Sequence, residues 1–175
     1  ILAAIAISLP LVVALAVACL GVRSDLFQLD TPHLPLIKLI FGLAVTLIGG
    51  LLLTRLASPG GEVGAPTAIA FIPFAIILAL GIAAVTFASS ASLHDLIDGT
   101  GWLNCVISIP LIASVPFTLI VFVLRRFAAP TNLIKTGAIA GLTSGGLGAI
   151  GYALHCPDNS IAFIAGWYVA AIGLT

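Results

Sequence analysis

The chain has 175 residues, of which 61% are apolar and only 7% are charged, whereas an ordinary soluble domain carries about 25% charged residues. Six basic and six acidic residues cannot cover the surface of a soluble globule of this size, so the composition predicts a polytopic membrane protein. A net charge of zero argues against the basic surface that direct nucleic-acid binding requires, and the composition also argues against a soluble enzyme.

Six apolar runs are long enough, or nearly so, to cross a bilayer, which takes about 20 residues per helix. The runs are continuous rather than alternating, which predicts helices and not the strands of a barrel. Because the first and last runs are cut within apolar sequence, we expect both native ends to lie outside this chain. We predict one transmembrane domain over residues 1–175, an all-α bundle of six helices at 1–22, 36–56, 67–90, 103–124, 135–154 and 161–175.

The basic residues predict how this bundle is oriented, because cytoplasmic loops retain Lys and Arg. Only Arg23 and Lys38 flank the first break, and the third and fifth breaks hold no basic residue. We therefore expect the second and fourth breaks, and both termini, to face the cytoplasm. The basic residues at these two breaks are the predicted topology anchors Arg55, Arg125, Arg126 and Lys135.

Glycines recur every four residues in the fifth run, at Gly137, Gly141 and Gly145. A stripe of small residues lets two helices approach closely, either within one chain, which we favour, or in a homodimer. Four prolines within the runs favour kinks that shape the packing. These prolines are Pro10, Pro73, Pro110 and Pro116.

Every cysteine and histidine falls on the extracytoplasmic side under this orientation. Cys105 and Cys156 stand at span boundaries, where an oxidising compartment allows two thiols to pair. Thiolates with His155 and His94 form a soft donor set that suits copper, zinc or cadmium. The residues therefore leave open a redox switch, a metal site and a structural disulfide. The full set is Cys19, His33, His94, Cys105, His155 and Cys156.

The segment Tyr152–Ser160, with the sequence Tyr-Ala-Leu-His-Cys-Pro-Asp-Asn-Ser, resembles the closing signature of the NrsF family. The members of this family are six-span anti-sigma factors of the inner membrane of proteobacteria. The similarity extends to further elements along the chain: Gly21–Leu26, Lys38, Cys105, Arg125–Arg126, Phe163 and Trp167–Tyr168.

This resemblance implies that the protein holds an extracytoplasmic-function sigma factor at the bacterial inner membrane. Stress outside the cytoplasm, from heavy metal or oxidant, would release it. The two periplasmic sensing cysteines of the family map onto Cys105 and Cys156. The sigma-binding part would lie largely in an N-terminal tail that precedes this chain. We thus predict a membrane anti-sigma factor involved in transcription regulation, and not an enzyme.

Two other classes of protein compete with this prediction. A small metal-handling permease needs a polar path through the bundle, and no span carries an ionisable residue near its middle. A membrane thiol oxidoreductase is disfavoured because the chain has no Cys-x-x-Cys motif.

Overall fold

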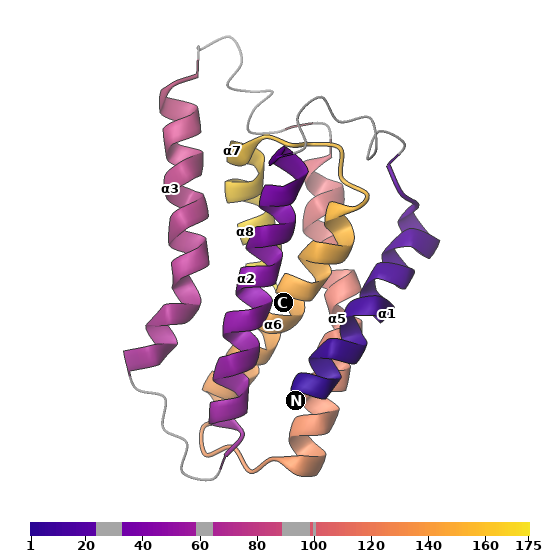
Figure 1. Cartoon of the computed structure of the whole chain (residues 1–175), viewed down its shortest axis with the longest axis vertical. Coiled ribbons are helices and arrows are strands. Elements are labelled where there is room, and N and C mark those ends of the chain that lie inside the picture. Colours follow the sequence, from indigo (N-terminus) through magenta and orange to yellow (C-terminus); the bar gives the residue numbers. More distant parts are fainter. Residues whose placement is uncertain (24–32, 59–64, 89–98, 100) are drawn as a thin grey trace.

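The computed structural model describes residues 1–23, 33–58, 65–88, 99 and 101–175, without the side chains of 33–35 and 65–66. Regular secondary structure in these ranges is helical throughout, which confirms the all-α prediction (Figure 1). The long elements are α1 (Leu2–Leu20), α2 (His33–Leu56), the 3₁₀ helix η1 (Ala65–Phe71) with α3 (Ile72–Thr86), α5 (Trp102–Phe127) and α6 (Leu133–Ala153). The chain closes with α7 (Ile161–Phe163), the π-helix η3 (Ile164–Tyr168) and α8 (Val169–Gly173).

Among the described residues, five helices are long and apolar enough to cross a membrane, and they coincide with the first five predicted runs. The sixth run forms a shorter apolar helix over Ile161–Gly173, in which one segment is wound as a π-helix. Large apolar side chains point outward from the long helices; Ile40 is 63% and Leu111 70% exposed. This outward-facing apolar surface is what a lipid-facing bundle requires, and it is rare on a soluble monomer.

Helix α6 lies at the centre of the bundle and packs against α2, α5, α1 and α8. Its glycines make this possible: a Cβ added at Gly146 would meet the Gly42 carbonyl of α2 at 3.0 Å, and one at Gly148 would meet the Ile109 carbonyl of α5 at 2.7 Å. The small residues therefore serve packing within the chain. Gly137 has no neighbour of this kind within 4 Å, and a homodimer through the stripe stays a prediction.

The prolines are accommodated in two ways. Pro10 lies inside α1, and Pro110 and Pro116 lie inside α5. Pro73 instead lies in the first turn of α3, directly after η1. Backbone N–H groups in a first turn have no acceptor within the helix, so the N–H that proline lacks is not needed there.

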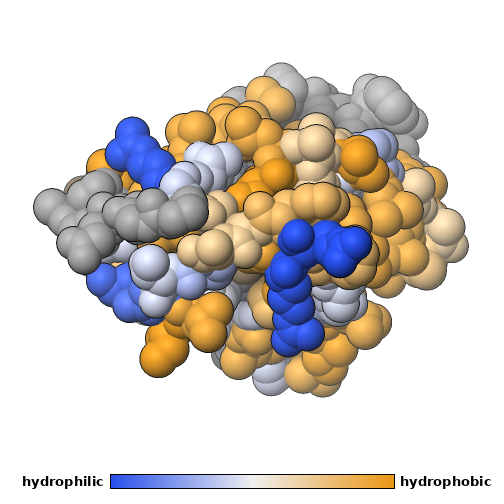
Figure 2. Space-filling model, turned by 90° about the horizontal axis from the view of Figure 1, so that it is seen from below, coloured by the Kyte–Doolittle hydropathy of each residue, from blue (hydrophilic) through white to orange (hydrophobic). Residues whose placement is uncertain are grey.

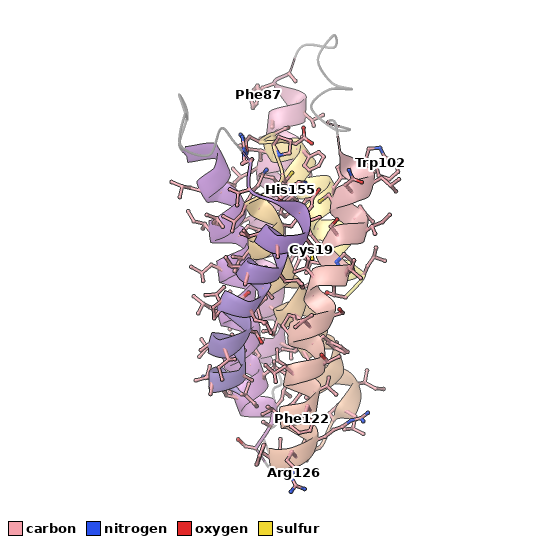
Figure 3. All side chains as sticks on the ribbon, turned by 90° about the vertical axis from the view of Figure 1, so that its right-hand side faces the viewer. Cys19, Phe87, Trp102, Phe122, Arg126 and His155 are labelled. Atoms are coloured by element: carbon pink, nitrogen blue, oxygen red, sulfur yellow. The ribbon has the colours of Figure 1, made fainter. Side chains whose placement is uncertain are left out.

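The two ends of the bundle carry different chemistry. Cys105 lies in the first turn of α5 and Arg126 in its last, and 26 residues of helix span about 39 Å. Figure 3 shows His155 and Trp102 near one end of the molecule and Arg126 near the other. Figure 2 views the Arg126 end, where a few strongly hydrophilic side chains stand among hydrophobic ones. These ends are called the thiol end and the basic end below.

Candidate functional site

Cys105 and Cys156 belong to one buried cluster of core residues and both lie near the thiol end. Cys105 is presented by the first turn of α5, and Cys156 by the connection between α6 and α7. Their side chains are 0% and 1% exposed, and both belong to the same group of packed core residues. Both thiols are free. The structure thus brings together two cysteines that are far apart in the sequence.

The Cys156 backbone is held by charged donors from two other elements. Lys38 Nζ of α2 donates to the Cys156 carbonyl oxygen at 3.1 Å, and an Arg23 Nη, just after α1, donates to the same oxygen at 3.0 Å. The Cys156 N–H donates to the Tyr152 carbonyl at 3.0 Å. Both backbone polar groups of Cys156 are therefore satisfied, and the backbone that carries the thiol is held by three elements. The contacts of Lys38 and Arg23 with the Cys156 carbonyl are called the Cys156 clamp.

Lys38 is the most unusual member of the site because its side chain is 0% exposed. Its ammonium donates to the Cys156 carbonyl oxygen and lies 5.8 Å from the centroid of the Tyr168 ring. A buried cation is costly unless it is paired, so these contacts hold α2 firmly to the thiol site.

Arg23 also ties the α6–α7 connection to the end of α1. It donates to the side-chain oxygen of Asn159 at 3.2 Å, and its backbone N–H donates to the Leu154 carbonyl at 3.3 Å. The chain reaches this position through Gly21, whose φ of 78° and ψ of 173° are a combination that glycine adopts readily. His155 Nδ1 lies 3.4 Å from the Gly21 carbonyl oxygen, on the outer side of the connection.

The π-helix η3 completes the site. It places Tyr168 in the core at 0% exposure, where its hydroxyl has no hydrogen-bond partner among the described atoms. Short π-helical segments are rare and frequently occur at functional sites. Trp167 of the same segment stacks on Trp102 at the start of α5, with ring centroids 4.7 Å apart.

The predicted site residues are distributed as follows. Cys105 and Cys156 come together, and His155 lies at the same end without joining their buried cluster. His94 lies outside the described residues, as does the side chain of His33. Cys19 is exposed on α1. Within the described ranges no group of three or more His, Cys, Asp or Glu residues is arranged to hold a metal, so metal binding stays a prediction.

The predicted topology anchors share the exposed surface of the basic end: Arg55, Arg125, Arg126 and Lys135. Arg55 ends α2, Arg125 and Arg126 end α5, and Lys135 lies in the first turn of α6. Asn132 caps the N-terminus of α6, because its side-chain oxygen accepts a hydrogen bond from the Lys135 N–H at 3.0 Å. Four cations thus gather at the end opposite the thiols.

The sequence reasoning used Lys38 and Arg23 to weigh orientation and as elements of the family resemblance, and it missed their contacts with Cys156. A signal was present, since both are basic residues on the side where the orientation argument expects few. Tyr168 was recognised only as part of the family resemblance, because nothing in an apolar run indicates which aromatic side chain turns inward.

Within the described residues the protein is an all-α bundle with five membrane-length helices, exposed cations at one end and two buried cysteines at the other, and this architecture indicates a polytopic membrane protein. A family model described as negative regulator of sigma F, NrsF, matches residues 1–175. The chain therefore belongs to the NrsF family, as the resemblance predicted. This family is one of regulatory anti-sigma factors and not of enzymes.

Two curated relatives agree with this assignment. The chain is 32% identical over 164 residues to the anti-sigma-F factor NrsF of Caulobacter vibrioides, and the match covers 91% of this chain and 76% of the relative. It is 30% identical over 168 residues to the probable anti-sigma-F factor NrsF of Azospira oryzae, covering 91% and 78%. No solved structure matches the chain significantly.

Proposed function

We propose that this protein is an anti-sigma factor embedded in the bacterial inner membrane. It holds an extracytoplasmic-function sigma factor at its cytoplasmic face and releases it when Cys105 and Cys156 react on the periplasmic face. The observation that carries the proposal is that both cysteines are buried in one core cluster, at the end opposite the four exposed cations. Cations mark the cytoplasmic side of membrane proteins, and their position therefore supports a periplasmic thiol end.

Two chemical events at the thiols fit this role. An oxidant that accepts two electrons converts the two thiols into a Cys105–Cys156 disulfide, and two protons are released. Alternatively, a soft metal ion such as copper, cadmium or zinc binds the two thiolates, with His155 and His94 as further ligands. Either event changes the spacing between the start of α5 and the α6–α7 connection.

Helix α6 supports the transfer of this change to the cytoplasmic side. Its outer end leads into Cys156, its inner end carries Lys135, and between them it packs on four other helices. The close contacts of the α6 glycines with α2 leave little room for side chains to repack. We therefore expect α6 to shift relative to α2 as a rigid body.

The test is a reporter gene that depends on the partner sigma factor, in cells that carry the full-length protein. Cys105→Ser, Cys156→Ser and the double variant should lose induction by cadmium, copper or diamide, while repression without inducer is kept. Cys19→Ser is the matched control, because this thiol is exposed on α1 and lies outside the cluster. Normal induction in the double variant would refute sensing by the pair. Failure of any sigma factor to co-purify with the wild-type protein would refute the anti-sigma role itself.

A further inference from the structure

The thiol that the proposed function needs is closed to reagents in this structure. The Cys156 side chain is 1% exposed and that of Cys105 is 0% exposed. An oxidant or metal ion can reach these sulfurs only through a local opening, and such openings occur at a free energy set by the contacts that must break. The contacts that hold the Cys156 connection therefore decide how readily the site reacts.

The Cys156 clamp supplies the strongest of these contacts. Hydrogen bonds from charged donors are roughly twice as strong as those between neutral groups, and the Cys156 carbonyl accepts two of them. The donors come from α2 and from the segment after α1, so the connection is tied to two helices besides α6. A hydrogen bond within the connection would not link it to the rest of the bundle in this way.

Lys38 contributes more than Arg23 to keeping the site closed. The Arg23 side chain is only partly buried, so water can replace the Cys156 carbonyl as its acceptor when the connection moves. The hydrogen bonds of the Lys38 ammonium within the described residues all go to Cys156, and Lys38 is 0% exposed. When the connection moves outward, Lys38 is left as a buried cation without an acceptor, which is far more costly than a lost neutral hydrogen bond.

We propose that Lys38, assisted by Arg23, is a gating residue that controls access to the Cys156 thiol, so that a reagent reaches this sulfur only when the clamp opens. As a step in sensing, this inference rests on the proposed function. The accessibility of a thiol, however, can be measured without any sigma factor. An experiment can therefore refute the gating by Lys38 without refuting the proposed function, and the reverse.

The test is timed alkylation by N-ethylmaleimide of the full-length protein in native membranes, with each cysteine followed by mass spectrometry. Lys38→Met should speed the labelling of Cys156 at least tenfold, which corresponds to about 1.4 kcal/mol of opening free energy. The labelling of Cys105 should stay slow. Lys38→Arg keeps a cationic donor and should return Cys156 close to the wild-type rate. Cys19 is exposed and reports that the reagent is delivered equally in every sample.

Two further variants separate gating from general destabilisation. Arg23→Gln removes the other donor of the clamp, which is partly buried and lies after the end of α1. This variant should speed Cys156 labelling less than Lys38→Met does. Lys135→Met removes an exposed lysine at the basic end and should change nothing. Unfolding exposes both buried thiols, so an equal rise at Cys105 would overturn the proposal. A wild-type rate at Cys156 in both Lys38→Met and Arg23→Gln would overturn it as well.

The reporter with Cys105→Ser and Cys156→Ser tests the function independently. If induction survives the loss of both thiols while Lys38→Met still speeds Cys156 labelling, the result supports gating by Lys38 and refutes sensing by the two cysteines.

Discussion

A single methyl group at Gly146 tests the packing of α6 against α2. A Cβ at this position would lie 2.7 Å from Thr46 Oγ1, 3.0 Å from the Thr46 backbone nitrogen and 3.0 Å from the Gly42 carbonyl oxygen. Two of these three atoms belong to the backbone of α2, so a change of side-chain rotamer cannot relieve the overlap. Gly146→Ala therefore forces the two helices apart by several tenths of an ångström.

The size of the effect follows from two opposing contributions. Overpacking of a well-packed interior typically costs about 1–3 kcal/mol. Replacing glycine by alanine inside a helix contributes about 1 kcal/mol in the other direction. Gly137→Ala is the matched control, because it lies on the same helix with nothing within 4 Å of an added Cβ. The helix-propensity gain cancels between the two variants, so Gly146→Ala should be less stable than Gly137→Ala by about 1–3 kcal/mol.

Reversible unfolding in detergent micelles, followed by circular dichroism as dodecyl sulfate is titrated in, measures this difference. Equal stability of Gly146→Ala and Gly137→Ala would refute the close α2–α6 contact. Destabilisation confined to Gly137→Ala would point instead to an interface between two copies of the chain through the open end of the glycine stripe.

Two further predictions concern the thiol end and use the same unfolding assay. Tyr168→Phe should leave the free energy of unfolding unchanged or raise it, because the buried hydroxyl makes no hydrogen bond among the described atoms; a loss above about 1 kcal/mol would reveal a bond there. Gly21→Ala should destabilise the bundle by about 1–3 kcal/mol, because its φ of 78° is unfavourable for residues with a Cβ although the space around it is open; stability equal to the wild type would contradict the observed backbone.

The sequence predicts five of the long helices because the length of an apolar run is enough to indicate a membrane-length helix. It does not reveal that the glycine-rich fifth run lies at the centre of the bundle. Hydropathy records composition and not neighbours, and α6 is central because Gly146 and Gly148 let the backbones of α2 and α5 approach it. Nor does the sequence indicate the π-helical winding over Ile164–Tyr168, since no local pattern distinguishes it from an ordinary helix.

The two residues of the Cys156 clamp show where sequence reasoning could have gone further. The orientation of the bundle rests on four basic residues at the cytoplasmic breaks, and Arg23 and Lys38 were the only basic residues on the other side. A cation on that side opposes the usual charge distribution. The structure supplies the reason, because both side chains turn into the protein to the same carbonyl oxygen. In a chain with so few charges, the basic residues that break the orientation rule are therefore the first to examine as members of a site.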